Sequence, residues 1–165
     1  MKRRIFFDMD GVLAKWEDAP IEEIAAPGYF LHRKPDYNIL SAFNEVVESG
    51  LYEVFILSSV FKDDHSAAEK LKWLRTYGVK LDEQHILFSI YGSSKSDYVP
   101  EQRPDDILVD DFSYNLRTWH GIGVKYLNGI NATKGTWKGF TVSGNSSSTY
   151  IAATIMAISN MINVA

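Results

Sequence analysis

The sequence predicts an α/β protein in which helices cover both faces of a central parallel sheet, as a three-layer α/β/α sandwich. Short apolar runs alternate along the chain with longer segments whose apolar residues recur at helical spacing. Strands that are apolar on both faces are typical of parallel sheets that are covered by helices. Polar and acidic residues directly follow several of these runs, at the edge where open α/β sheets bind their ligands.

Composition limits the class of protein and its partners. The 165 residues, 45% of them hydrophobic, suit a single domain over residues 1–165. The formal net charge of −4 gives no general attraction to nucleic acid or to an anionic membrane, so we expect stable binding to neither. Cysteine is absent and the first apolar run is too short for a signal peptide, so we expect a cytoplasmic protein.

The regular elements follow from apolar patterning. Apolar runs predict strands over 5–8, 54–57, 86–88, 107–109 and 124–127. Apolar residues on one face predict helices over 38–49 and 64–77, each followed directly by a glycine. Residues 137–142 predict either a further strand or one arm of a hairpin.

The end of the chain differs from the rest because residues 139–165 carry no charge. A helix is expected here, beginning at Ser146, Ser147 or Ser148 and running to about Asn163. Its apolar stripe consists of Ile151, Ile155, Ile158 and Ile162. We expect this stripe to pack on the sheet. A homodimer face is the alternative, because an uncharged second face is unusual for a solvated helix.

Residues 14–37 are predicted to be a minimal cap inserted after the first strand. Pro27, Gly28 and Pro35 interrupt this segment, so we expect a short helix near 20–25 and then a loop. Its aromatic residues form either a substrate pocket or a small apolar cluster under a long loop; they are Trp16, Tyr29, Phe30 and Tyr37.

Two carboxylates follow the first strand. Asp8 would end the strand, and Asp10 would face the same side because residues two apart share a face of an extended chain. Gly11 then allows a sharp turn. Two acids this close are costly to bury unless a cation or a shared proton offsets their charge. The pair therefore indicates bound Mg²⁺, a proton-transfer role or both, with a solvated turn as the alternative.

Further polar residues are expected at the same edge. Ser58 and Ser59 end the second strand, Asp110 and Asp111 end the fourth, and Lys95 lies in the connection before the fourth. Carboxylates suit a hard cation, hydroxyls can bind phosphoryl oxygens, and the lysine can neutralise negative charge. This set favours metal-assisted phosphoryl transfer.

These residues carry a family resemblance. In chain order, Asp8-Met9-Asp10-Gly11-Val12, Leu57-Ser58-Ser59, Lys95 and Val109-Asp110-Asp111 resemble the four motifs of the haloacid-dehalogenase-like (HAD-like) phosphohydrolases. The 5′(3′)-deoxyribonucleotidases of that superfamily are a closer match, since they carry an aromatic residue where Trp16 stands and a loop like Pro27-Gly28-Tyr29-Phe30. The resemblance implies a Rossmann-like sheet whose first strand lies between the second and the fourth.

The resemblance also implies an activity, that of a Mg²⁺-dependent phosphomonoesterase acting on (deoxy)nucleoside 5′- or 3′-monophosphates. Asp8 would be the nucleophile that forms an aspartyl-phosphate, and Asp10 the general acid and base. Ser58 and Ser59 would bind phosphoryl oxygens, and Lys95 would neutralise the nucleophile and the phosphate.

The implied Mg²⁺ site uses the Asp8 carboxylate, the Asp10 backbone carbonyl and the Asp111 carboxylate. Asp110 and Asn115 would support these ligands from outside. Trp16, Tyr29 and Phe30 would form the substrate pocket.

Two other functions remain open. The segment between the first two motifs is short for a deoxyribonucleotidase, so the substrate of the same chemistry could be a sugar phosphate or the phosphate end of an oligonucleotide. A phosphate-binding module without turnover is the alternative from another class, and the presence of both Asp8 and Asp10 argues against it.

Overall fold

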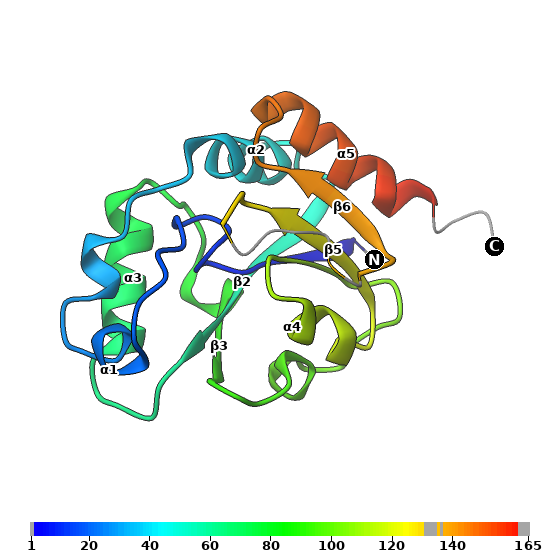
Figure 1. Ribbon diagram of the computed structural model, residues 1–165. Coiled ribbons are helices and arrows are strands. Elements are labelled where there is room, and N and C mark those ends of the chain that lie inside the picture. The colour runs from blue at the N-terminus through cyan, green and yellow to red at the C-terminus, as the bar shows by residue number, and fades with distance from the viewer. Residues whose placement is uncertain (1, 131–134, 136, 162–165) are drawn as a thin grey trace.

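The computed structural model describes residues 2–130, 135 and 137–161, and its strands form one six-stranded parallel sheet (Figure 1). The strand order is β3-β2-β1-β4-β5-β6. The strands are β1 (Arg3–Phe7), β2 (Tyr52–Val60), β3 (Ile86–Ile90), β4 (Ile107–Asp110), β5 (Ile122–Leu127) and β6 (Phe140–Ser143). The predicted fold class is confirmed, and β1 lies between β2 and β4 as expected.

Helices lie on both sides of this sheet. The α-helices are α1 (Ile21–Ile24), α2 (Tyr37–Glu48), α3 (Ser66–Thr76), α4 (Ser113–Thr118) and α5 (Ser148–Met161). Short 3-10 helices lie in the connections of the described chain, η1 (Phe30–His32) before α2, η2 (Glu83–His85) before β3 and η3 (Lys95–Tyr98) before β4. In Figure 1, α2 and α5 lie above the sheet and α4 lies below it.

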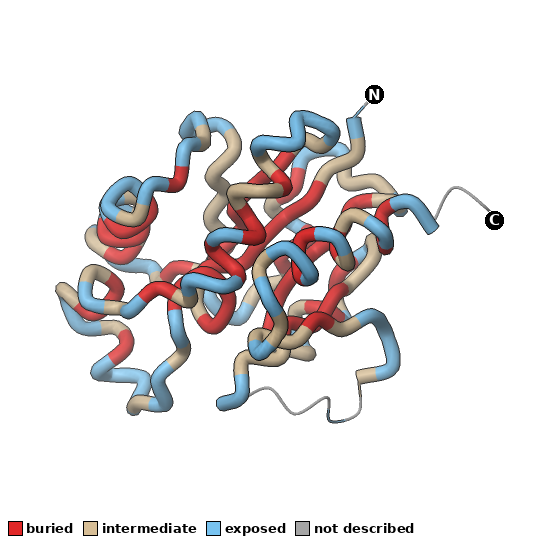
Figure 2. Tube along the Cα trace, turned by 90° about the horizontal axis from the view of Figure 1, so that it is seen from above, coloured by how far each residue is buried: buried red, intermediate tan, exposed pale blue. Residues whose placement is uncertain are grey.

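Two apolar clusters fill the spaces between the layers, because successive residues of a strand point to opposite faces. Ile5 and Phe7 of β1 belong to the larger cluster, which includes side chains of α2, α3 and α5. Phe6 points the other way and packs with Leu116 of α4 and with Trp119. The buried residues accordingly run through the centre of the molecule in Figure 2, and exposed residues surround them. The sheet is therefore a rigid support for the loops at its carboxyl edge.

The end of the described chain settles one open alternative. β6 pairs with β5 in parallel, so the hairpin arm considered for residues 137–142 is wrong. Helix α5 packs on α2, and Ile151, Ile155 and Ile158 are buried in the core. Ile162 and Asn163 lie outside the described residues. The homodimer stays a prediction. Within residues 2–130, 135 and 137–161, no helix combines the length and apolar character needed to span a bilayer.

Hydrogen bonds to α3 hold the segment 14–37 in place. The carboxylate of Glu69 accepts the backbone N–H of Gly28 at 2.6 Å and that of Phe30 at 3.3 Å. One turn later, the indole N–H of Trp73 donates to the carbonyl of Arg33 at 2.7 Å. The segment is thus attached to the helix that follows β2, and it lies beside the carboxyl edge of the sheet.

Candidate metal centre

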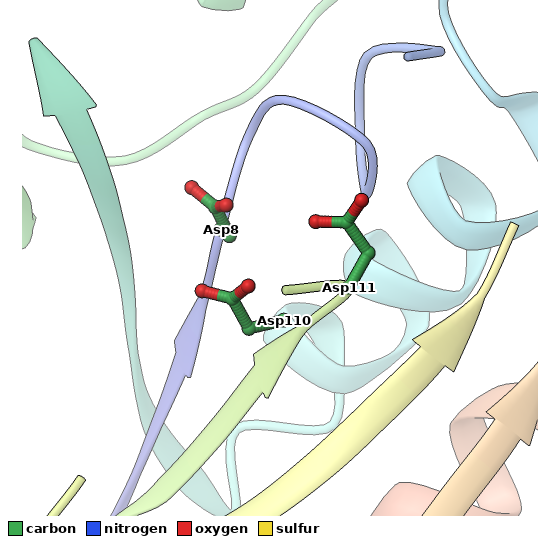
Figure 3. Close-up of side chains that lie close together, drawn as sticks. All are labelled: Asp8, Asp110 and Asp111. Atoms are coloured by element: carbon green, nitrogen blue, oxygen red, sulfur yellow. The ribbon is translucent and has the colours of Figure 1, made fainter. Parts of the chain in front are cut away.

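Three buried carboxylates meet where β1 and β4 end. Figure 3 shows Asp8 following β1, Asp110 ending β4 and Asp111 directly after it. One oxygen from each of the three lies within 4.8 Å of the others. Buried acids this close require positive charge nearby, and carboxylate oxygens are the ligands that hard divalent cations prefer. The group could therefore bind a metal ion.

One carboxylate oxygen of Asp8 is held by contacts with the protein. Its Oδ1 accepts the backbone N–H of Met9 at 2.7 Å and lies 2.9 Å from the ammonium group of Lys95. Asp8 also lines a cavity at this edge of the sheet. Both of these contacts, which are made with described residues, use Oδ1. Oδ2 is therefore the Asp8 oxygen that can bind a ligand.

Lys95 lies behind the acids and compensates part of their charge. Its Nζ donates to Asp110 Oδ2 at 2.7 Å, and the side chain is 1% exposed. Burial alone would lower the pKa of Lys95, but the carboxylates of Asp110 and Asp8 outweigh this and raise the pKa above its ordinary value. Lys95 is therefore a permanent cation of the site.

Both carboxylate oxygens of Asp110 accept hydrogen bonds from the protein. Its Oδ2 accepts hydrogen bonds from Lys95 and, at 2.9 Å, from the amide of Asn115, and its Oδ1 accepts the backbone N–H of Phe112 at 2.7 Å. Burial raises the pKa of Asp110, Lys95 offsets only part of this effect, and Asp8 adds to it. With both oxygens occupied by protein donors, Asp110 is placed to position Lys95 and the loop after β4.

Asp111 is held against the turn after β1. The side-chain amide of Asn128 donates both to the carbonyl of Gly11 at 2.9 Å and to Asp111 Oδ2 at 3.0 Å. Gly11 has φ +79°, and a Cβ at this position would lie 2.1 Å from Asp111 Oδ2. Glycine is therefore needed here for both its backbone conformation and its small size. We did not identify Asn128 from the sequence, although it follows β5 at the same edge of the sheet.

Asp10 lies apart from the three grouped acids. Its carboxylate pairs with the ammonium group of Lys70 on α3 and accepts a hydrogen bond from Ser58 Oγ at 3.4 Å. We also missed Lys70 in the sequence. The available signal was its position in the helix, three residues after Ala67 and four before Leu74, which places a lysine on the apolar face.

A cavity of about 490 Å³ opens beside these groups. Its acidic and polar lining includes Asp8, Asp10, Asp111, Ser59 and Asn115. Ser58 is fully buried behind it, and the hydroxyl of Ser59 hydrogen-bonds that of Ser89 at 3.0 Å. The predicted polar residues therefore all lie at one edge, with Ser58 and Lys95 beneath the lining.

The cavity is also strongly aromatic. Of the three aromatic residues expected to contact substrate, Trp16 and Phe30 line it. Tyr29 does not; it is buried and lies under the guanidinium of Arg33, 4.1 Å from its ring centroid. Four further aromatic residues come from the segments that follow β2, β3 and β4 rather than from the segment 14–37, and they are Phe61, Tyr91, Phe112 and, in α4, Tyr114.

Comparisons with known proteins do not identify a function. No family model matches the chain, and no curated protein matches its sequence. Among solved structures, the chain is similar to the structure of DsGPDH of Dunaliella salina at 15% identity and a TM-score of 0.48. The similarity covers 86% of this chain and 27% of that one, so the chain spans about a quarter of that structure, and the likeness is too low to support an inference. Fold and site together define a Rossmann-like α/β protein with a buried acidic group that could bind a metal ion.

Proposed function

We propose that the protein is a metal-dependent phosphomonoesterase in which Asp8 is the nucleophile. The observation that carries this proposal is the group of Asp8, Asp110 and Asp111 with Lys95 among them, at the edge of an aromatic cavity. The ordered motifs that resemble the HAD-like phosphohydrolases support the same chemistry. Asp8 borders the cavity. An ion-pair cluster with a purely structural role would not need an acid in that position.

The proposed reaction has two displacement steps. Asp8 Oδ2 attacks phosphorus, the bond from phosphorus to the ester oxygen breaks, and Asp10 gives a proton to the leaving oxygen. A water molecule then attacks phosphorus in the aspartyl-phosphate, Asp10 takes the water proton, and the bond to Asp8 breaks to release inorganic phosphate. Ser58 and Ser59 bind phosphoryl oxygens, and Lys95, whose Nζ lies 2.9 Å from Asp8 Oδ1, offsets the negative charge at the nucleophile.

Mg²⁺ is the cofactor that suits this donor set. Asp8 and Asp111 would hold it with their carboxylates, and the Asp10 backbone carbonyl is a further ligand by resemblance to the family. The ion would supply positive charge that polarises the phosphoryl group. Asn128 and Gly11 keep Asp111 in position for this role.

A nucleoside monophosphate is the substrate that we propose for this chemistry. The cavity borders the acidic group and is lined by Trp16 and Phe30, with Phe112 and Tyr114 near the acids that end β4. Aromatic side chains bind bases by stacking and are tolerant of base identity. A base between such rings would leave its phosphate close to Asp8.

The test is phosphate release from deoxynucleoside monophosphates, sugar phosphates and a 3′-phosphorylated oligonucleotide, each with Mg²⁺ and with EDTA. We expect Mg²⁺-dependent release that is fastest with the nucleotides. Asp8→Asn should reduce it about a thousandfold or more, while the exposed control Asp82→Asn should not. Retained turnover in Asp8→Asn would remove the nucleophile assignment, and turnover of other esters alone would replace the substrate. Phosphate binding without turnover would favour the non-catalytic module.

A further inference from the structure

The charges around the cavity are unbalanced. Among the described lining residues, the acids are Asp8, Asp10, Asp18 and Asp111, and the one lysine or arginine is Lys70. Lys95 is buried behind Asp8 and Asp110 and is not part of the lining. A phosphate dianion that enters this cavity therefore meets Lys70 as its first cation, although the motif pattern points to Lys95.

Lys70 is buried and fully engaged where it lies. Its side chain is 1% exposed, and Nζ donates to the Asp10 carboxylate, to Ser58 Oγ at 2.9 Å and to the carbonyl of Ser59. The ring of Phe30 lies 4.4 Å from the same nitrogen. An ammonium group has three donors, so these contacts use all of them and fix the direction in which the charge points.

Lys70 and Ser58 together bind the Asp10 carboxylate, and the same two groups would suit a phosphoryl oxygen. Lys70 supplies the charge, and Ser58, the hydroxyl expected to bind phosphate, also donates to Asp10 at 3.4 Å. The Asp10 side chain is 19% exposed and borders the cavity, whereas the Lys70 side chain is 1% exposed and Ser58 is fully buried, so Asp10 is the member of this group that has solvent beside it.

We propose that Lys70 is a phosphate-binding residue and that the Asp10 carboxylate occupies the phosphoryl-oxygen position while the site is free. Binding of phosphate exchanges one anion for another on Lys70 and Ser58, and it releases Asp10 toward the leaving oxygen. This inference rests on the proposed function. It adds a substrate-contacting cation on α3, outside the four motifs, and it gives the Asp10–Lys70 pair a role in ligand entry.

If Asp10 and phosphate compete for Lys70, the affinity for inorganic phosphate should change in a way that a purely structural role of Lys70 would not cause. The affinity for inorganic phosphate is measured by titration calorimetry with Mg²⁺ present, for wild type, Lys70→Met, Asp10→Asn and the double variant. Lys70→Met should weaken binding about ten- to a hundredfold, the range for loss of a hydrogen bond to a charged group. Asp10→Asn should tighten it, because a neutral amide competes less well than a carboxylate for Lys70.

The double variant separates this competition from simple repulsion between Asp10 and phosphate. With Lys70 absent, Asp10→Asn should no longer tighten binding, whereas repulsion would persist without the lysine. Lys72→Met on the same helix is the matched control, because Lys72 is exposed, and it should bind phosphate as wild type does. Circular dichroism verifies that each variant is folded, and Lys70→Gln replaces Lys70→Met if the latter does not fold.

The outcomes distinguish this inference from the proposed function. Wild-type affinity in Lys70→Met, tightening that persists in the double variant, or no phosphate binding by wild type would each overturn the inference. If esters are hydrolysed but phosphate affinity does not depend on Lys70, the phosphomonoesterase proposal stands without it. If no ester is hydrolysed but phosphate binding depends on Lys70 as described, the inference stands and the activity does not.

Discussion

The ammonium group of Lys95 lies 2.9 Å from Oδ1 of Asp8, in a part of the sheet edge from which water is almost excluded. The same nitrogen donates to Asp110 at 2.7 Å. A single buried cation thus stands between two buried acids on neighbouring strands. The charge of the site is only partly balanced without a further cation, which is the condition that a metal ion would meet.

Removal of this lysine should destabilise the protein. Lys95→Met leaves Asp8 and Asp110 buried without their cation, and removing one partner of a buried ion pair costs about 3–5 kcal/mol. Urea unfolding in EDTA measures the loss. Mg²⁺ should restore part of the stability because it binds only the folded state. The exposed Lys80→Met is the control and should unfold as wild type does; equal stability of the two variants would contradict the assigned role of Lys95.

Gly11→Ala should abolish metal binding. Its Cβ would meet Asp111 Oδ2 at 2.1 Å, so Asp111 has to move out of the acidic group. Gly78→Ala is a matched control, since Gly78 has φ +76° and nothing within 4 Å of an added Cβ. Both variants should lose about 1–2 kcal/mol through the left-handed backbone. Only Gly11→Ala should lose the rise in melting temperature that Mg²⁺ produces, and an unchanged rise would separate Asp111 from the metal site.

The sequence predicts the sheet well because each central strand is a continuous apolar run between polar residues. It does not predict α4, which has six residues and too few turns to establish a helical repeat. It also leaves β6 open, because a four-residue strand at the edge of the sheet carries the same pattern in a hairpin and in a parallel pair.

The sequence predicts the site residues at the ends of three strands, but it does not predict Lys70, which lies on α3. The residues at the ends of β1, β2 and β4 converge because parallel strands share one carboxyl edge. Lys70 reaches the same edge from α3, where a lysine is ordinarily solvated, and only the packing of α3 on the sheet brings it inward. Tyr29 is the reverse case. The aromatic pattern placed it in the substrate pocket, but it is buried within the segment 14–37, beneath the guanidinium of Arg33.

Phe112→Ala should weaken the binding of nucleotides more than that of small esters. Phe112 is 56% exposed and lines the cavity directly after the acidic pair. Loss of one base–aromatic contact costs about 1–3 kcal/mol, which corresponds to about a five- to hundredfold rise in KM for a deoxynucleotide. KM for glycerol phosphate, which has no base, should change little. Tyr150→Ala removes an aromatic ring that is 65% exposed on α5 and should leave both values unchanged; equal changes for both substrates would exclude stacking on Phe112.

The free energy of unfolding should decrease at acid pH, in part because Asp63, which precedes α3, becomes protonated. Its carboxylate accepts the backbone N–H of His65 at 3.0 Å and that of Ser66 at 2.7 Å. Burial acts to raise the pKa of Asp63, but these hydrogen bonds outweigh it and hold the pKa below its ordinary value. A carboxyl group whose pKa is lowered on folding stabilises the fold above its unfolded pKa, and this contribution is lost as the pH falls through the folded pKa.

Asp63→Ala should therefore reduce the free energy of unfolding by about 1 kcal/mol at pH 7, as loss of a helix-start acceptor does. The difference from wild type should shrink as the pH falls below about 4, the ordinary range of the Asp pKa. Chemical unfolding at pH 7, 5 and 3 measures both quantities. Asp64→Ala is the control, because its fully exposed side chain accepts no backbone N–H at this helix start. A difference between Asp63→Ala and wild type that persists at pH 3 would show that the carboxylate charge does not stabilise the start of α3, the helix that carries Lys70.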